Sequence, residues 1–399
     1  MHLSFQVPAR ARLPLAALLL AGTALPAWAL DGDAFASKVN EAYAVSGANI
    51  EYDRVDVDGS TVTLTNSKLA SPGAPAFEAG DLVFEGVEKT GDGGYTVDVL
   101  KIADIDYTKD DANLKVSDIE MSGIVVPATP GANSLDDMIL YEGFTTGPVS
   151  VSSKGDEVFS MAGFDGKLSR LSGDAGIDFT GTANGMTVHY EGIEDPKAKK
   201  TLNELGYEEL TGSAKMALSW ELESGRVDMR EMSMTMDDAG RFNIALDLSG
   251  YTMEFVQAMQ KAQAATANNP DPEEAQKAQG LMMLGMMQQL TFNSAEITFE
   301  DASLTGRVLD YFGSQQGISG KQMGDAVKGM LPMMLGQLGI PALQQQISAA
   351  ANTFVDNPEN LKISAEPAEP VPFSQIMGVG MSDPRQLADL LEVKVTAND

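Results

Sequence analysis

Methionine is the residue type whose frequency stands out, and its thioether sulfur could do chemistry. The chain has 22 methionines, 15 of which lie between Met216 and Met334. Thioether sulfur is a soft ligand that suits Cu(I). Two groups are spaced closely enough for such a site: Met229, Met232, Met234 and Met236, and Met282, Met283, Met286 and Met287. Both groups follow the spacing of an apolar face, where methionine serves as a flexible filler, so we expect no metal site.

The chain has few residues that could serve as a catalytic nucleophile or its base. The chain has no cysteine, and His189 is its one histidine after residue 29. His189 alternates with Val188 and Tyr190, which places it on the polar side of a strand. No Gly-x-Ser-x-Gly elbow is present to supply an activated serine. We therefore predict no catalytic residues.

Carboxylates are abundant, but none forms a recognisable site. Two carboxylates suffice for glycoside hydrolysis, but no pair can be singled out among 57 Asp and Glu. Sugar-binding clefts usually have several aromatic side chains, and Trp220 is the one tryptophan after residue 29. Asp56, Asp58 and Gly59 match the start of a calcium loop. Arg54 and Thr65 then occupy its first and twelfth positions, where that loop needs carboxylates. A carboxylate-pair hydrolase stays a third hypothesis, and we predict no metal or cofactor.

Charge restricts the partners. The chain has 27 Lys and Arg against 57 Asp and Glu, a formal net charge of −30. A nucleic-acid binder needs a cationic surface over the phosphates, so nucleic acid is excluded as a partner. Neutral, apolar or basic partners are expected, and the oligomeric state is left open.

Residues 1–29 have the pattern of a signal peptide. Arg10 and Arg12 precede the apolar run 13–25, and Ala27 and Ala29 are the small residues that signal peptidase accepts. We predict cleavage after Ala29 and a periplasmic location. No later segment reaches the length of a transmembrane helix, so we do not expect an integral membrane protein.

Residues 30–250 are predicted to form a short helix and then a long antiparallel sheet. Apolar and polar residues alternate along successive segments that are separated by Gly-, Asp- and Asn-rich turns. The clearest pattern is a three-stranded meander over 214–249. The apolar parity of its middle strand switches between Met229 and Met232, which predicts a β-bulge near Arg230 and Glu231.

Residues 251–399 are predicted to be a mixed, largely helical region that closes the sheet. Helical spacing marks 253–266, 272–290, 323–338 and 343–355, and short strands are expected at 361–365 and 393–396. The predicted fold is α+β and mainly β, a long antiparallel meander with Met-rich helices packed on it in the C-terminal part. The predicted organisation is a signal peptide (1–29), a β-rich region (30–250) and a closing region (251–399).

Three segments carry a resemblance to a known group. The meander 214–250, the segment 299–307 (Phe-Glu-Asp-Ala-Ser-Leu-Thr-Gly-Arg) and the proline-rich tail 357–398 resemble a family of uncharacterised exported proteins of Gram-negative bacteria. The succession of amphipathic strands is more distantly similar to AsmA-like envelope proteins. That similarity implies a long sheet whose groove takes part in lipid transfer.

The leading hypothesis is a non-enzymatic periplasmic protein that binds an apolar, lipid-like ligand or an envelope partner through an amphipathic sheet. Methionine adapts to such ligands because its unbranched side chain repacks at little cost. The alternative is a purely structural or interaction protein of the envelope with a sealed core. The candidate ligand-binding residues are Met282, Met283, Met286, Met287, Met330 and Met334.

Overall fold

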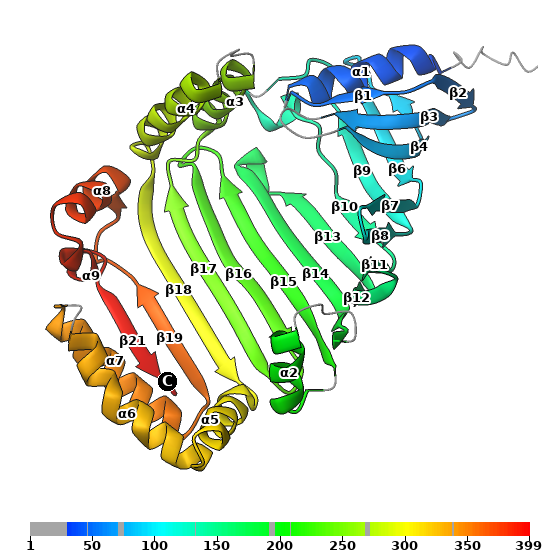
Figure 1. The fold of residues 1–399 in the computed structure, drawn as a ribbon. Helices are drawn as coiled ribbons and strands as arrows, with labels where there is room; N and C mark the ends of the chain where they lie inside the picture. Colours follow the sequence, from blue (N-terminus) through cyan, green and yellow to red (C-terminus); the bar gives the residue numbers. More distant parts are fainter. Residues whose placement is uncertain are drawn as a thin grey trace, which may run out of the picture.

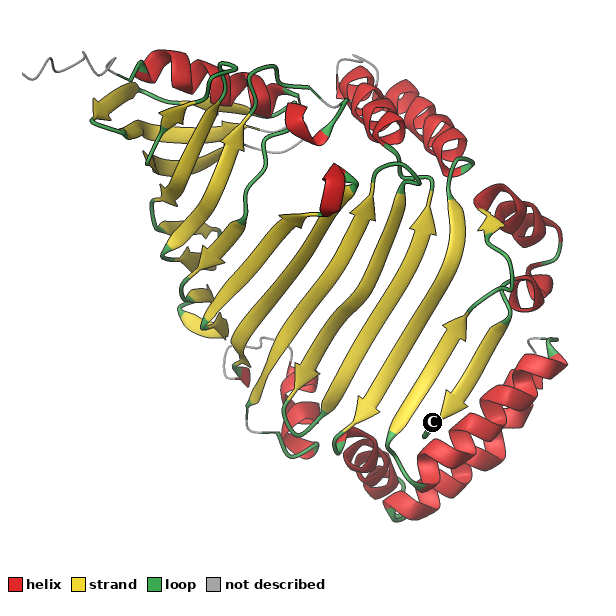
Figure 2. Cartoon of the chain, turned by 180° about the vertical axis from the view of Figure 1, so that it is seen from behind, coloured by secondary structure: helices red, strands yellow, loops and turns green. Residues whose placement is uncertain are grey.

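The computed structural model describes residues 30–399, except 46, 71–75, 132, 191–195, 208, 268–271 and 337–338. The predicted signal peptide lies outside the described residues. The chain forms one long antiparallel sheet with helices along its borders (Figures 1 and 2). The α+β, mainly β fold with a long antiparallel sheet and C-terminal helices is thus confirmed.

The N-terminal part of the sheet is covered by the helix α1 (Gly32–Ala44). Asp31 caps this helix by accepting a hydrogen bond from the Ala34 amide, 3.0 Å away. Phe35 of α1 is fully buried. Its ring makes T-shaped contacts with the rings of Phe84 and Tyr95, at centroid distances of 5.1 and 5.2 Å. The strands of this part are β1 (Asn49–Glu51), β2 (Arg54–Asp58), β3 (Thr61–Ala70), β4 (Phe77–Glu85), β5 (Glu88–Lys89), β6 (Tyr95–Ile102) and β9 (Ile119–Val126).

The central and C-terminal strands continue the same sheet. Each strand pairs with the next in antiparallel fashion from β9 through β10, β13, β14, β15, β16, β17, β18 and β19 to β21. The sheet therefore continues past the predicted boundary at residue 250, because β17 pairs directly with β18. The bounds are β10 (Gly143–Thr146), β13 (Gly163–Arg170), β14 (Gly176–Val188), β15 (Leu210–Glu221), β16 (Arg226–Met236), β17 (Gly240–Ser249), β18 (Thr291–Asp301), β19 (Asn360–Ala365) and β21 (Val393–Ala397).

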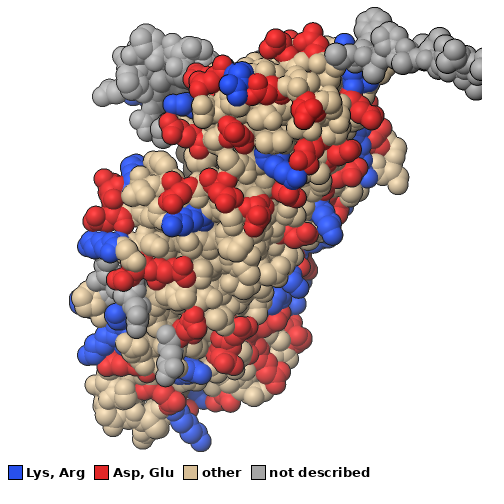
Figure 3. Space-filling view, turned by 90° about the vertical axis from the view of Figure 1, so that its right-hand side faces the viewer, with Lys and Arg blue, Asp and Glu red and all other residues tan. Residues whose placement is uncertain are grey.

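Smaller strands attach at the side. β7 (Ile105–Lys109), β8 (Ala112–Val116), β11 (Val149–Ser153) and β12 (Asp156–Met161) form a branch that joins the sheet through β12 and β14. β20 (Val371–Pro372) pairs with the start of β18. Figure 3 looks at the N-terminal side of the molecule and shows acidic side chains spread across it, with fewer basic ones between them.

The remaining helices lie mostly at the ends of the strands (Figure 1). α3 and α4 stand at one end, and α2 and α5 at the other. α7 packs beside β19 and β21, α6 lies against α5 and α7, and α8 and α9 follow β20. Among the described residues, no helix combines the length and the apolar character needed to cross a membrane. The bounds are α2 (Pro196–Glu204), α3 (Met253–Ala267), α4 (Pro272–Met287), α5 (Leu304–Gln315), α6 (Gly320–Gly336), α7 (Pro341–Asp356), α8 (Phe373–Ser382) and α9 (Leu387–Leu390).

The predicted β-bulge is confirmed in β16. Met229 pairs with Leu246 and Met232 with Ile244, so two residues of β16 lie opposite Ala245 of β17. On the other side of β16, Arg230 has no partner in β15. The extra residue reverses the parity of the strand, which keeps Met229 and Met232 on one face of the sheet.

Candidate functional site

One face of the sheet is apolar over its central and C-terminal strands, and we call it the apolar face. Residues directly opposite each other in an antiparallel sheet point to the same side, so the pairing defines rows that run across the strands. Three neighbouring rows cross β13, β14, β15, β16, β17, β18, β19 and β21. The middle row is Gly166, Gly181, Met216, Met232, Ile244, Ile297, Ile363 and Val395.

The rows on either side have the same character. One is Phe164, Ala183, Ala214, Met234, Phe242, Phe299, Leu361 and Ala397. The other is Leu168, Phe179, Leu218, Met229, Leu246, Ala295, Ala365 and Val393. No side chain in these three rows carries a polar nitrogen or oxygen atom.

The apolar face is open to solvent at its centre. Met232 and Met234 are each 47% exposed, Phe242 is 43% exposed and Ile297 is 41% exposed. Burial of such side chains is worth about 1.5 to 3 kcal/mol each, so their exposure in one continuous patch is costly. A contiguous exposed apolar patch on a folded chain marks an interaction surface or a ligand groove.

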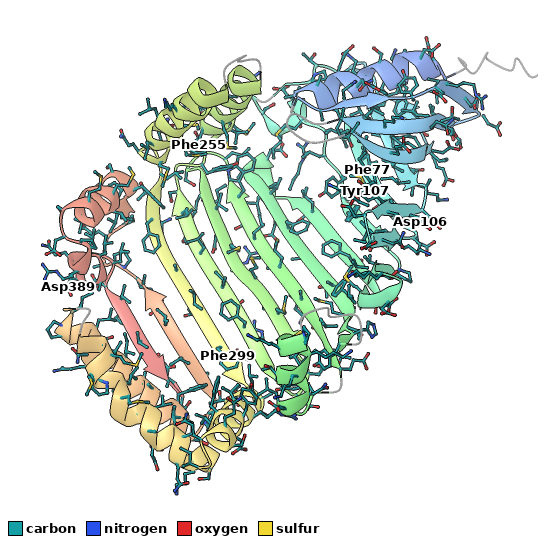
Figure 4. The ribbon with its side chains drawn as sticks, in the orientation of Figure 1. Phe77, Asp106, Tyr107, Phe255, Phe299 and Asp389 are labelled. Carbon is teal, nitrogen blue, oxygen red and sulfur yellow. The ribbon has the colours of Figure 1, made fainter. Side chains whose placement is uncertain are left out.

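Helices border the open part on all sides. α1 covers the same face at the N-terminal end, where Phe84 meets Phe35. At the C-terminal end Phe354 of α7 packs on Phe299, with ring centroids 6.2 Å apart. α3 closes one strand end through Met253 and Trp220, and residues of α2 and α5 close the other. Figure 4 shows Phe299 near the α5 end of the sheet and Phe255 on α3 at the opposite end.

A cavity of about 550 Å³ lies on the apolar face. Met234, Phe242 and Phe299 form part of its floor, and Leu304 of α5 lies at its border. Its size is within the range of small-molecule sites, which are mostly apolar and concave. The cavity is thus a preformed place for an apolar ligand.

Two glycines shape the floor beside this cavity. Gly166 and Gly181 pair across β13 and β14, and neither has the positive φ that would require glycine. A Cβ atom on either one would lie 2.8 Å from the ring of Phe164. The ring of Phe179 approaches the same two positions within 3.4 Å. The absent side chains therefore let both phenylalanine rings lie over the backbone.

The opposite face of the sheet is polar and tied by ion pairs. The Nε–H of Arg226 is shared between the two Oδ atoms of Asp247, each 3.1 Å away, and Nη2 donates a hydrogen bond of 2.7 Å to Oδ2. Burial acts to raise the pKa of Asp247, but the hydrogen bonds from Arg226 and Asn293 outweigh it and lower that pKa. Arg241 bridges Glu231 and Glu300 at 3.0 and 2.7 Å.

Glu231 belongs to the same polar face. Hydrogen bonds from Ser233 and then from Arg241 lower the pKa of its carboxyl group. These charges face away from the apolar rows, because Arg241 and Glu300 flank Phe242 and Phe299 in sequence and strand neighbours point to opposite sides. In this region the charged side chains thus lie on the face of the sheet opposite the apolar rows.

His189 has partners that the sequence did not indicate. Its Nε2 lies 3.0 Å from Ser160 Oγ and 2.9 Å from Glu157 Oε1, and its Nδ1 lies 3.6 Å from Glu209 Oε1. Glu157 competes with Ser160 for Nε2, and Glu209 at 3.6 Å is too far from Nδ1 for the hydrogen bond that orients the histidine of a catalytic triad. The arrangement is a polar cluster on the strand surface. Among the described residues, no group of three or more His, Asp or Glu could hold a metal ion.

The six predicted methionines lie on the helices and not on the apolar face. Met282 and Met283 of α4 are exposed, Met286 packs against Phe255 of α3, and Met287 is half-buried. Met330 and Met334 of α6 are exposed. Figure 1 places α4 and α6 at opposite strand ends, so the structure does not bring the two groups together.

The exposed methionines of the sheet were missed by sequence reasoning. Met232 and Met234 belong to the group that sequence analysis assigned to a buried face. The alternation along the strand correctly placed both methionines on the apolar face. Alternation does not show whether another element covers that face. The cross-strand register, which aligns them with Phe242 and Ile297, was the missing signal.

Part of the chain matches a known protein family. Residues 233–398 match a family described as "Uncharacterized protein", which is consistent with the predicted resemblance to uncharacterised proteins and covers the second half of the meander and the C-terminal tail. No curated protein matches the chain. On this comparison, the C-terminal part of the chain, including β17, β18, β19 and β21, is similar to a family of uncharacterised proteins.

Proposed function

We propose that this protein is a periplasmic, non-enzymatic binder of lipid-like ligands and that the apolar face holds their hydrocarbon chains. The observation that carries the proposal is the set of three uninterrupted apolar rows, whose centre is exposed to solvent at Met232, Met234, Phe242 and Ile297. A ligand without hydrogen-bonding groups fits this surface, because no polar side chain in the rows would lose a partner on contact.

The dimensions of the apolar face suit acyl chains. Neighbouring strands lie about 4.8 Å apart, so the seven pairings from β13 to β21 span roughly 34 Å. The hydrocarbon of one bilayer leaflet is about 15 Å thick, half of the core of about 30 Å. The face is therefore longer than one extended acyl chain. This argument also supports a distant AsmA-like role in lipid handling.

An envelope protein partner is the other candidate occupant of the face. We favour the lipid because the side chains of the three rows offer no hydrogen-bonding group, whereas a typical protein interface forms about ten hydrogen bonds. A sealed core is disfavoured by the exposure of Met232, Met234 and Phe242.

A binding experiment tests the proposal. Purified full chain is titrated with a fluorescent fatty-acid probe, and Met234→Glu is compared with Met381→Glu, which changes an almost fully exposed methionine on α8. Met234→Glu should weaken probe binding at least tenfold, since a carboxylate would be buried under the hydrocarbon chain. Met381→Glu should bind like the wild type.

A second measurement addresses the natural ligand. Native mass spectrometry of the protein from the periplasm should reveal bound acyl compounds in the wild type and their loss in Met234→Glu. Absence of probe binding together with absence of co-purified lipid would refute the proposal. Stoichiometric co-purification of a protein that depends on Met234 would instead identify a protein partner on this face.

A further inference from the structure

A second apolar surface lies on the helices, apart from the apolar face. On α4, Leu281 is 73% exposed, and Met282, Met283 and Leu284 are exposed beside it. On α6, Met333 is 78% exposed, and Met330 and Met334 are exposed on the same helix. α4, α8 and α6 follow one another along one side of the molecule in Figures 1 and 2, which we call the C-terminal flank.

The inner sides of these helices are already used for packing. Met286 of α4 is buried against Phe255 and Ala262 of α3. Met323 of α6 is buried, and Gly324 lies close to Val355 of α7. The exposed residues of α4 and α6 are thus an outer surface that the fold does not need for its own core.

The exposed residues of α4 and α6 lie in segments of the sequence that carry no charge. Charged residues make up 21% of the chain. Even so, none occurs between Lys277 and Glu296 or between Lys328 and Asp356. The N-terminal side, by contrast, is covered with acidic groups (Figure 3). Transfer of the uncharged helix surfaces out of water requires no desolvation of an ion.

We infer that the exposed parts of α4 and α6 dock onto the surface of an uncharged bilayer. A helix that lies in the membrane interface buries its apolar side chains at the boundary of the headgroups and the acyl chains. Most such helices also carry basic residues that attract anionic lipids. Here the apolar contact acts without them, and a chain of charge −30 is repelled by an anionic surface.

This chemistry selects the bilayer over a second copy of the chain. Two molecules that each carry 30 negative charges in excess repel each other, whereas a zwitterionic surface has no such repulsion. Methionine adds to the preference, because its flexible side chain adapts to a fluid surface. The docking surface is distinct from the apolar face, so it stands whether or not that face binds lipid.

Vesicle flotation tests the inference. The wild-type chain should float with phosphatidylcholine vesicles and should float less with vesicles that contain phosphatidylglycerol. Raising the salt concentration should reduce this difference, since it screens the repulsion. The double variants Leu281→Glu with Met283→Glu and Met330→Glu with Met333→Glu should each lose at least tenfold in vesicle affinity.

Matched variants separate docking from charge and from ligand binding. Val57→Glu with Tyr107→Glu adds the same charge at exposed apolar positions of the N-terminal part and should float like the wild type. Met234→Glu should also float normally, because it alters the apolar face only. All these positions are exposed, so thermal unfolding should be cooperative in every variant.

A fluorescence readout complements flotation. The chain has no cysteine, so Met333→Cys creates a single site for an environment-sensitive dye. Its emission should shift to the blue on addition of phosphatidylcholine vesicles, and a dye at Tyr107→Cys should not shift. The inference is overturned if the wild type does not float, or if the helix variants float like the N-terminal control. It is equally overturned if light scattering shows a dimer that the α6 variant dissociates.

Discussion

At the scale of single residues, Gly166 and Gly181 have a role that their backbone does not require. Both lie in regular strands with ordinary φ, and side-chain-free positions inside strands are unfavourable for stability. Their contacts with Phe164 explain them, since the ring occupies the space above the two Cα atoms. The two glycines thus allow the Phe164 ring to lie flat against the sheet at β13 and β14.

Substitution of Gly181 tests this role. Gly181→Val should leave the fold intact and raise the Phe164 ring away from the sheet, because the added Cβ would meet the ring at 2.8 Å. We expect a severalfold loss in affinity for the fatty-acid probe, with a change of about 1 kcal/mol or less in the free energy of unfolding. Gly306→Ala, at a helical position with open space around it, should bind the probe normally.

Asp247 predicts a pH dependence of stability. Its pKa is lowered in the folded protein, so its contribution is present above the ordinary value of 3.8 and is lost as the pH falls through the folded pKa. Asp247→Asn should lower the free energy of unfolding by about 1 to 3 kcal/mol at pH 7, because Arg226 loses a charged partner.

The same variant provides its own control. Below pH 3.8 the carboxyl of the unfolded chain protonates first and that of the folded protein follows at its lowered pKa, so the difference in urea unfolding between the wild type and Asp247→Asn should shrink steadily as the pH falls below 3.8. A constant difference between the two curves from pH 7 to pH 3 would contradict the assignment.

At the scale of elements, the helices border the apolar face where it ends. α1 does so through Phe35, which is fully buried between Phe84 and Tyr95. Phe35→Ala should lower the free energy of unfolding by about 3 to 5 kcal/mol, as is usual for a buried phenylalanine. Urea unfolding measures this loss, and a value under 1 kcal/mol would show that α1 does not hold the N-terminal strands.

The elements also show what sequence can predict. The alternation around Met229 and Met232 predicted both the meander and its bulge, because period and parity are local properties of the chain. The position of α4 and α6 at opposite strand ends was not predictable in this way. It depends on contacts between segments far apart in sequence, and periodicity does not define them.

At the scale of the whole molecule, the predicted functional residues illustrate the same limit. The sequence indicated methionine as the functional residue type, but Met282 and Met330 lie on the C-terminal flank. The residues that form the floor of the cavity, such as Met234 and Phe242, become adjacent only through strand register. Local patterns do not determine which strands pair or which faces stay uncovered.

Export is a prediction at the same scale. If residues 1–29 are a signal peptide, the mature chain begins at Leu30, one residue before the Asp31 cap of α1. Intact-mass measurement of the protein from the periplasmic fraction should give the mass of residues 30–399. Retention of the first 29 residues in that fraction, or a cytoplasmic location, would contradict the prediction.

The ion pairs on the polar face of the sheet bear on how the apolar face would bind a ligand. On this face Arg226 and Arg241 link neighbouring strands through Asp247 and Glu300, and Arg230 of β16 reaches across β15 to Asp178 of β14. If the apolar face binds lipid as proposed, a sheet that is cross-linked in this way needs little reorganisation on binding, and the ligand-free protein should bind its ligand at a rate set mainly by diffusional encounter.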